Sequence, residues 1–185
     1  MAAVLEKLSD MVQPKPKALI PVTDGSEEIE VVVMWDLLAR AGVRVTLAHV
    51  GETHEHHIIK LARGTEIQAE KPIEYCLDED YDLIVLPGGP GAKTLGASAI
   101  LVTILQNHKA AGKLYGAICA APVDVLFRNS LVLGAFYSPD PVVVHGNCVT
   151  SQAPGTAIPM ALRLIEMLRG EKVAASVARA AIILP

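Results

Sequence analysis

The sequence predicts an α/β fold in which helices cover both faces of a mostly parallel β-sheet. Strand-like and helix-like segments alternate from residue 17 onward, and the strand-like segments are nearly continuous apolar runs. Apolar residues make up 51% of the 185 residues, which is enough for one domain with a substantial core. In sheets of this kind the ligand site lies beyond the carboxyl ends of the strands.

The first half of the chain is expected to supply two buried strands and the helix between them. The apolar segment KALIPVT indicates a strand, and DGSEE provides a turn and an acidic helix start. The next segment, IEVVVMWDLLARAG, has helical apolar spacing and ends at Gly42. The expected order is strand 17–23, turn 24–28, helix 29–42, strand 43–50, polar loop 52–57 and short extended segments over 58–70.

The second half contains the clearest strand, YDLIVLPGG, in which a charged residue precedes the apolar run and Pro-Gly-Gly ends it. The expected order is strand 81–89, helix 99–112, strand 113–119, helix 120–127, a hairpin over 141–151 and a last helix over 156–170. Three loops then fall at carboxyl ends of strands, namely DGSEEIE, PGGPGA and CAAP.

Composition narrows the class of protein. The net charge is −4 without a long basic run, so nucleic-acid binding has no support. The apolar runs are far shorter than a membrane span, and the start MAAVLEKLSD is too charged for a secretory signal. Three irregularly spaced cysteines do not indicate a disulfide framework, which favours a reducing compartment, the cytoplasm. Residues 1–16 are interpreted as an N-terminal extension with a short helix, and residues 17–185 as the domain.

Cys119 lies where the strand over 113–119 is expected to turn sharply into a helix. Backbone N–H groups and the positive dipole end at the helix start favour a thiolate, which predicts a lowered pKa for this thiol. The alanines around it leave room for a tight, strained turn that follows the logic of a nucleophile elbow, although the motif is not GxSxG. The alternative is a small buried hydrophobic residue, which is the interpretation we favour for Cys76 and Cys148.

Three acidic residues, Glu27, Glu28 and Glu30, open the first helix. Acids are favoured there by the helix dipole, so simple capping is one interpretation. Glu30 differs because its neighbours are apolar, and such a carboxylate is expected to be partly buried with a raised pKa. A raised carboxyl beside a lowered thiol could share a hydrogen bond with it or act as a general base. The sequence places both loops at one sheet edge but does not show that the two groups meet.

The glycine segment PGGPGA lacks the pattern of a phosphate-binding loop. Gly88 and Gly89 could instead direct a backbone N–H group at an oxyanion beside Cys119. The alternative is a plain turn that ends the strand.

With DGSEEIE, DLIVLPGG, GAICAAP and TSQAPGT in this order and spacing, the chain resembles the DJ-1 branch of the DJ-1/ThiJ/PfpI superfamily over about residues 17–184. The resemblance implies a flavodoxin-like α/β sandwich and a homodimer. By this resemblance, Cys119 is the reactive cysteine at a nucleophile elbow, and Glu30 is the carboxylate that hydrogen-bonds to it. The resemblance also implies that the N–H groups of Gly89 and Ala120 form an oxyanion hole. It further implies two arginines near the pocket, Arg40 and Arg63.

Members of this family are described as redox-sensitive protective proteins, as glutathione-independent glyoxalases that convert methylglyoxal to lactate, and as protein deglycases. The leading hypothesis is therefore a cysteine-dependent glyoxalase or deglycase-type protein that acts on methylglyoxal and related 2-oxoaldehydes, protects against oxidative stress and needs no metal or organic cofactor. The alternative is a non-enzymatic redox sensor or chaperone in which Cys119 is oxidised to sulfinate. A PfpI-like protease is disfavoured because no histidine follows Cys119 within GAICAAP.

The interval between the cysteine helix and the late hairpin departs from the family pattern. It is shorter by about a strand and a helix, and it lacks the histidine that the family often carries there. We expect a break near Ala135–Phe136, where the sequence skips a loop. The alternative is a real deletion, which would open the pocket and favour the redox sensor.

One further cluster, His54, Glu55, His56 and His57, resembles a set of metal ligands. No additional ligand is spaced to close a site, so we expect a surface loop.

Overall fold

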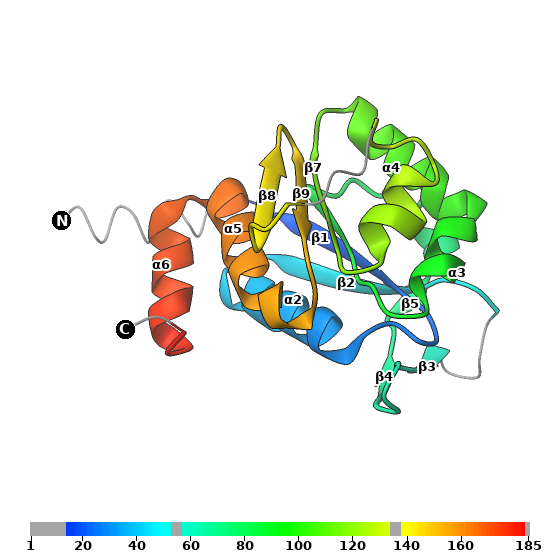
Figure 1. Ribbon diagram of the computed structural model, residues 1–185, viewed down its shortest axis with the longest axis horizontal. Coiled ribbons are helices and arrows are strands. Elements are labelled where there is room, and N and C mark those ends of the chain that lie inside the picture. Colours follow the sequence, from blue (N-terminus) through cyan, green and yellow to red (C-terminus); the bar gives the residue numbers. More distant parts are fainter. Residues whose placement is uncertain (1–13, 53–56, 134–137, 184–185) are drawn as a thin grey trace.

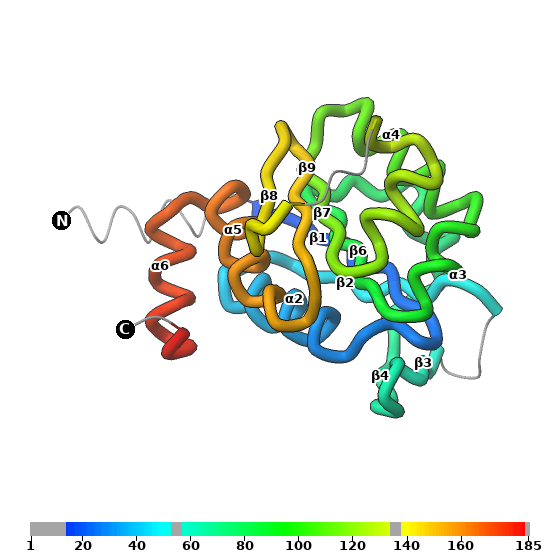
Figure 2. The backbone as a smooth tube through the Cα atoms, viewed as in Figure 1, coloured from blue at the N-terminus to red at the C-terminus, as the bar shows by residue number. Residues whose placement is uncertain are grey.

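A seven-stranded sheet forms the centre of the molecule, with the strand order β5-β2-β1-β6-β7-β9-β8 (Figure 1). The computed structural model describes residues 14–52, 57–133 and 138–183. The strands of the sheet are β1 (Lys17–Val22), β2 (Arg44–His49), β5 (Lys71–Pro72), β6 (Leu83–Leu86), β7 (Leu114–Ile118), β8 (Val142–His145) and β9 (Cys148–Ser151). A separate antiparallel hairpin joins β3 (Ile58–Lys60) to β4 (Glu66–Gln68) and projects from the body of the domain (Figure 2).

All neighbouring strands of the sheet are parallel except β8, which pairs antiparallel with β9. The register sets Leu86 of β6 beside Ala117 of β7, so these two strands end side by side. The segments that follow them, PGGPGA and CAAP, are therefore neighbours at the carboxyl edge of the sheet, where parallel sheets place their ligand sites.

Helices cover both faces, as the alternation of elements predicts. On one face lie α2 (Glu28–Arg40) and α5 (Ala157–Arg169), with α6 (Glu171–Ala180) packed against α5. On the other lie α3 (Ala92–Ala97), α4 (Ala99–Ala110) and the short π-helix η3 (Pro122–Phe127) (Figures 1 and 2). Two brief 3-10 turns, η2 (Ile73–Cys76) and η4 (Pro154–Thr156), complete the described elements.

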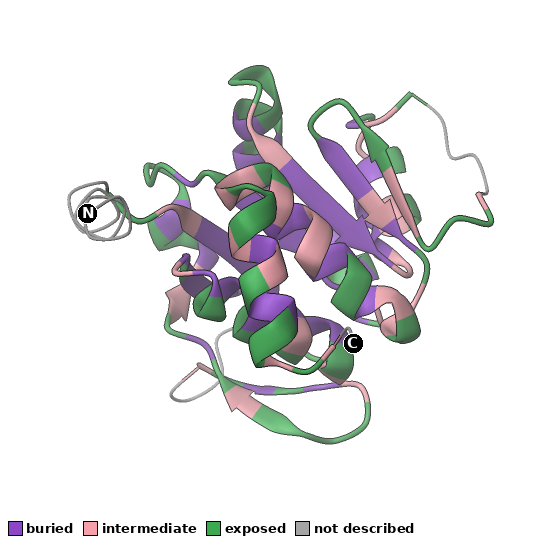
Figure 3. Cartoon of the chain, turned by 90° about the vertical axis from the view of Figure 1, so that its left-hand side faces the viewer, coloured by how far each residue is buried: buried purple, intermediate pink, exposed green. Residues whose placement is uncertain are grey.

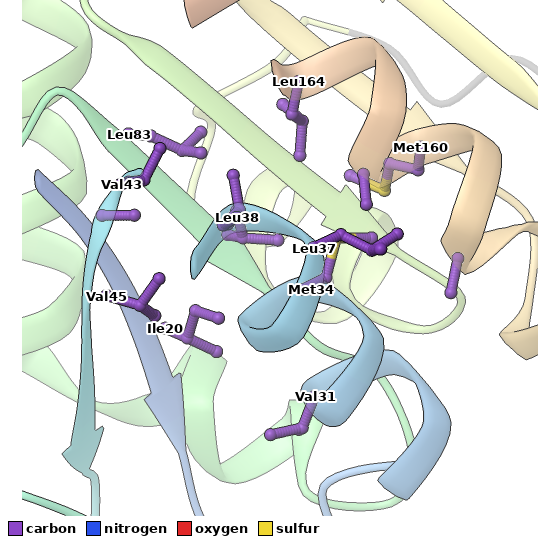
Figure 4. Packing of buried hydrophobic residues seen from close by; sticks show 14 of the residues in the cluster. Ile20, Val31, Met34, Leu37, Leu38, Val43, Val45, Leu83, Met160 and Leu164 are labelled. Atoms are coloured by element: carbon purple, nitrogen blue, oxygen red, sulfur yellow. The ribbon is translucent and has the colours of Figure 1, made fainter. Parts of the chain in front are cut away.

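The larger core cluster fixes the position of α2 on the sheet. Met34, Leu37 and Leu38 point from α2 toward the sheet and toward α5, where they meet Leu83 and Met160 (Figure 4). These side chains recur at helical spacing, which is why this segment forms an amphipathic helix. Each buried Leu or Met side chain stabilises the fold by about 1.5–3 kcal/mol relative to an exposed one. The first turn of α2, which carries Glu30, is thereby held against the sheet edge.

A second apolar cluster lies on the opposite face, between the sheet and α3, α4 and η3. The central strands, such as β1, β6 and β7, are buried from both sides, whereas the outer surfaces of the helices are exposed (Figure 3). This two-sided burial explains why the strands are continuous apolar runs instead of alternating ones.

Several predictions from the sequence require correction or stay open. The helices α3 and α6 and the short elements β5 and η2 were not predicted, and the segment after Cys119 is a six-residue π-helix. The predicted N-terminal helix, the residues His54 to His56 and the predicted break near Ala135–Phe136 all lie outside the described residues. The described residues between η3 and β8 contain no further strand or helix.

Among the described residues, no helix is both long and apolar enough to cross a membrane.

Candidate active site

Cys119 occupies a strained turn between β7 and η3. Its φ angle is 63°, in the left-handed region that residues with a side chain rarely adopt. Such a conformation costs about 1–3 kcal/mol and persists only where the surroundings enforce it. Here the Cys119 N–H group donates to the carbonyl of Ser151, the last residue of β9, at 3.1 Å. The prediction of a strained turn at this thiol is confirmed.

Gly88 allows the ends of β6 and β7 to approach each other. A Cβ atom at this position would lie 2.7 Å from Cys119 Cβ and 2.8 Å from the backbone nitrogen of Ala120. The next residue, Gly89, has a φ angle of 78°, and a Cβ there would lie 2.5 Å from the carbonyl oxygen of Gly25. The glycine turn is therefore required by the close packing of three loops at the sheet edge.

Glu30 is fully buried at this edge, with a relative exposure of 0%. Its Oε2 atom accepts a hydrogen bond of 2.7 Å from the N–H group of Gly88. Its own N–H group donates to the carboxylate of Glu27 at 2.9 Å, which caps α2. The second oxygen, Oε1, has no hydrogen-bond partner among the described residues. Gly88, which binds Glu30, also packs against Cys119, so the two predicted groups lie on either side of the same glycine.

Burial changes the acidity of both groups. It raises the pKa of Glu30, and hydrogen bonds from Gly88 and Cys119 oppose this change only in part. Burial and the nearby negative charge of Glu30 also raise the pKa of the Cys119 thiol, against the N–H groups of Gly89 and Ala120. The prediction for Glu30 is confirmed. The prediction of a lowered pKa for Cys119 is wrong, because burial disfavours the thiolate and the carboxylate of Glu30 adds a negative charge nearby.

Two backbone N–H groups favour the thiolate form of Cys119. They belong to Gly89, in the glycine turn, and to Ala120, directly after the cysteine. Donors that contact the sulfur also lie close to any atom that becomes bonded to it. The pair can therefore stabilise an oxyanion on a carbon attached to Cys119.

The two arginines lie outside this cluster. Arg40 is at the far end of α2, about 15 Å along the helix from Glu30, and forms an ion pair of 2.6 Å with Asp36. Arg63 lies in the turn of the β3–β4 hairpin, where its N–H group donates to the carboxylate of Glu28. It lines a cavity of about 650 Å³ together with Asp24. Of these two arginines, Arg63 is the one that lies near the loops surrounding Glu30.

The other thiols are packing residues, as predicted. Cys76 is fully buried and Cys148 is 7% exposed, whereas Cys119 is intermediate. Burial is also the main cause of the raised pKa of each of these two thiols. In the described part of the chain, no group of three or more potential metal-ligating side chains is found.

Sequence reasoning missed two features of this region. One is the Ser151 carbonyl, which holds the strained turn at Cys119. The other is a cavity of about 900 Å³ that extends from Cys119 across β7 and β9. Neither has a motif, because both arise from the pairing of β7 with β9 rather than from adjacent residues.

Comparisons with known proteins identify the family and the fold of this chain. The model of the DJ-1/PfpI family matches residues 16–135. "Protein DJ-1 homolog A" of Arabidopsis thaliana is 34% identical over 91% of this chain, but the chain spans only 46% of that protein. "Glutathione-independent glyoxalase DJR-1.2" of Caenorhabditis elegans is 33% identical over 82% of this chain and 87% of its own length.

A solved structure, "Toxoplasma gondii DJ-1, oxidized", superposes with a TM-score of 0.85 at 38% identity. It covers 90% of this chain, and this chain covers 98% of it. The first two curated relatives are about twice as long as this chain, which spans 46% and 44% of them.

Proposed function

The chain belongs to the DJ-1/PfpI family, and from this we propose that it is a cysteine-dependent, glutathione-independent glyoxalase that converts methylglyoxal to lactate. The observation that carries the proposal is the position of the buried carboxyl group of Glu30, which binds the N–H group of Gly88 while Gly88 itself packs against Cys119. The name of the nematode relative, a glutathione-independent glyoxalase, supports the same reaction.

The reactive form of the pair is a thiolate beside a neutral carboxylic acid. Both pKa values are raised, so the two groups hold one proton between them over a range of pH. When that proton is on Glu30, the carboxylate charge that opposes ionisation of Cys119 is gone. The carboxylic acid then donates a hydrogen bond to the sulfur, and the N–H groups of Gly89 and Ala120 stabilise the thiolate further.

The first step is attack of the Cys119 thiolate on the aldehyde carbon of methylglyoxal. A carbon–sulfur bond forms, and the carbonyl π electrons move to the oxygen. The N–H groups of Gly89 and Ala120 hold this oxyanion. It takes the proton of Glu30 to give a hemithioacetal, which leaves Glu30 as a carboxylate that can act as a base.

The second step moves a proton between two carbons of the bound substrate. Glu30 removes the proton from the carbon attached to sulfur, which gives an enediolate, and returns it to the neighbouring carbon, while the hydroxyl proton on the sulfur-bound carbon passes to the oxygen of that neighbour. The product is a lactoyl thioester on Cys119. Water then adds to the thioester carbonyl, releases lactate and restores the thiol. The sum is methylglyoxal plus water giving lactate and a proton, with no oxidant or reductant.

Lactate formation by the purified protein tests this proposal. Wild type is expected to form lactate from methylglyoxal without glutathione, and Cys119→Ser is expected to lose at least about 100-fold in rate. Cys76→Ser is the matched control, because it removes a fully buried thiol that lies outside the proposed reaction and outside the cavity beside Cys119. Equal rates for Cys119→Ser and wild type would contradict a cysteine-dependent reaction. Deglycase action is measured separately, with a glycated peptide from which free methylglyoxal has been removed.

A redox sensor is the second candidate function. Cys119 is the most accessible of the three thiols, and the Oε1 atom of Glu30 beside it has no nitrogen or oxygen partner among the described residues. A protonated Glu30 could donate a hydrogen bond to an oxygen added to the sulfur. Oxidation to sulfinate would then produce a stable state that signals peroxide, which fits a role in protection against oxidative stress.

We also propose that the chain forms a homodimer through the outer face of α2. Ile29, Val32 and Trp35 are 52%, 42% and 43% exposed, and their spacing places them on one side of the helix. Sedimentation equilibrium should give twice the chain mass for wild type and a monomer for Trp35→Glu. A monomeric wild type would contradict the proposal.

A further inference from the structure

The cavity beside Cys119 lies over the face of β7, β9 and β8 that α5 leaves free. Val149 of β9 belongs to the core beneath α5, whereas its neighbours Cys148 and Thr150 line the cavity on the other face. In β8, Val143 lines the cavity directly opposite Thr150. The cavity volume of about 900 Å³ is in the range that accommodates a small organic molecule.

The walls of this cavity are mainly apolar. Six of its lining residues are aliphatic: Val123, Leu126, Leu131, Val132, Leu133 and Val143. Tyr115 and Cys148 lie at the far end of the cavity. Burial raises the pKa of Tyr115 to about 12, and burial is also the main cause of the raised pKa of Cys148. Both groups are therefore neutral at physiological pH. The charged group of Lys109, which also lines the cavity, donates its hydrogen bond to the carbonyl of Leu131 at 2.6 Å.

The cavity is long enough for a chain of several carbons. Cys119 and Tyr115 are four residues apart along β7, which corresponds to about 13 Å of strand, and both line the cavity. The single methyl group of methylglyoxal would occupy only a small part of this length. An extended apolar substituent on the same reactive group would bury its surface against the aliphatic walls.

We propose that this cavity binds the alkyl or aryl tail of a larger 2-oxoaldehyde whose aldehyde carbon lies at Cys119. The inference rests on the proposed glyoxalase function and adds a substrate class to it, namely 2-oxoaldehydes with an apolar substituent of several carbons. Specificity then comes from the tail, since the reacting atoms are the same in every member of the class.

The cavity can be tested without any glyoxalase activity by using N-alkylmaleimides. In this reaction the Cys119 sulfur bonds to one carbon of the maleimide double bond, and the other carbon takes up a proton. Second-order rates at Cys119, followed by peptide mass spectrometry, are expected to rise with alkyl length from ethyl to octyl. Each buried methylene should contribute up to about fourfold. Glutathione, measured with the same reagents, corrects for their intrinsic reactivity.

Two strand positions provide a matched pair of variants. Val143→Trp places a large side chain inside the cavity, whereas Val144→Trp places the same side chain on the opposite face, where Val144 is 37% exposed. The first should flatten the dependence of rate on alkyl length, and the second should leave it unchanged. Val123→Trp, at a 53% exposed cavity residue, repeats the test on η3 in case Val143→Trp does not fold.

The substrate class is then tested with 2-oxooctanal against methylglyoxal. The ratio of their kcat/KM values should exceed ten in wild type and fall toward one in Val143→Trp. Maleimide rates that follow those of glutathione, or that keep their dependence on length in both cavity variants, would overturn the proposal. Absence of turnover with either aldehyde, together with length-dependent maleimide rates, would refute the glyoxalase function but support the apolar cavity.

Discussion

At the scale of single residues, the chemistry depends on how Cys119 and Glu30 share a proton. Burial disfavours the charged form of each group, and the carboxylate charge of Glu30 opposes ionisation of the thiol. A carboxyl group that keeps its proton instead supports the thiolate as a hydrogen-bond donor. The protonation state of Glu30 therefore decides the reactivity of Cys119. A substitution at Glu30 separates the effect of its negative charge from the effect of its proton.

Glu30→Gln is expected to lower the pKa of Cys119 and also to lower turnover. The amide removes the negative charge that raises the thiol pKa, but it cannot accept a proton from carbon, which should cost about 100-fold or more in kcat. Thiolate absorbance gives the pKa and lactate formation gives the rate. Glu166→Gln, in an exposed ion pair on α5, is the control. Unchanged turnover in Glu30→Gln would limit Glu30 to a structural role.

Peroxide is expected to oxidise Cys119 to sulfinate before it modifies Cys76 or Cys148. The latter two thiols are buried and Cys119 is not, and only Cys119 has a buried carboxyl group beside it. Peptide mass spectrometry after graded peroxide treatment measures the order. Equal oxidation of all three cysteines would remove the basis for the redox-sensor alternative.

Residue-level prediction succeeded for Glu30 and failed for the acidity of Cys119. Apolar neighbours along the chain predict burial of Glu30, because they belong to the same helix turn. The thiol pKa depends on burial by segments distant in the sequence, and on a carboxylate that reaches Cys119 from 89 positions earlier in the chain. Neither quantity can be derived from the residues adjacent to Cys119.

At the scale of elements, the site depends on the close approach of the segments after β6 and β7. Gly88 provides both the hydrogen bond to Glu30 and the space for Cys119. The Ser151 carbonyl at the end of β9 fixes the same turn from the other side. Three neighbouring parallel strands therefore position one sulfur atom.

Gly88→Ala is expected to reduce stability by about 1–3 kcal/mol and turnover by at least about tenfold. The added Cβ would meet Cys119 Cβ at 2.7 Å and backbone atoms of Ile118 and Ala120 within 3 Å, which forces the turn to move. Urea unfolding and lactate assays measure the two effects. Gly155→Ala, where a Cβ would meet no atom within 4 Å, should change neither. Wild-type behaviour of Gly88→Ala would show that the turn has more space than the structure indicates.

The major strands and the helices α2, α4 and α5 were predictable because each has a strong local pattern. Buried strands such as β6 are apolar runs between polar residues and a glycine stop, and α2 repeats apolar residues at helical spacing. The missed elements lack such patterns. β5 has only two residues, and α3 follows directly on the glycine turn. The alanine-rich α6 packs mainly against α5, so its burial depends on a tertiary contact.

At the scale of the whole molecule, the buried carboxyl group links stability to pH. The pKa of Glu30 is raised above its ordinary value of 4.5, so the folded chain retains a proton that the unfolded chain releases. The contribution of Glu30 to stability is therefore complete below pH 4.5 and is lost as the pH rises toward its folded pKa.

The difference in unfolding free energy between wild type and Glu30→Gln should accordingly decrease with rising pH above 4.5. The slope can reach about 1.4 kcal/mol per pH unit, which corresponds to one proton. Urea unfolding at a series of pH values measures both proteins, and the effects of titrating groups that do not interact with Glu30 cancel in the difference. Parallel stability curves, or a difference that grows with pH, would show that the pKa of Glu30 is not raised.

The family resemblance predicted the sheet architecture of the whole molecule but not its large cavity. The comparisons confirm the predicted family and the predicted fold. The cavity of about 900 Å³ depends on which face of β8 and β9 is covered by α5, and this is decided by packing between distant segments. The expected break near Ala135–Phe136 stays a prediction, because it lies outside the described residues.

The central claim is that Cys119 forms a covalent bond to the aldehyde carbon and that Glu30 then moves the proton. Nuclear magnetic resonance with methylglyoxal labelled with carbon-13 at the aldehyde carbon observes both steps directly. In Glu30→Gln we expect a stable hemithioacetal signal, absent from Glu30→Gln/Cys119→Ser, with little labelled lactate, whereas wild type converts the label to lactate. A Glu30→Gln sample that shows no sulfur-bound carbon, or that forms lactate as fast as wild type, would contradict the account.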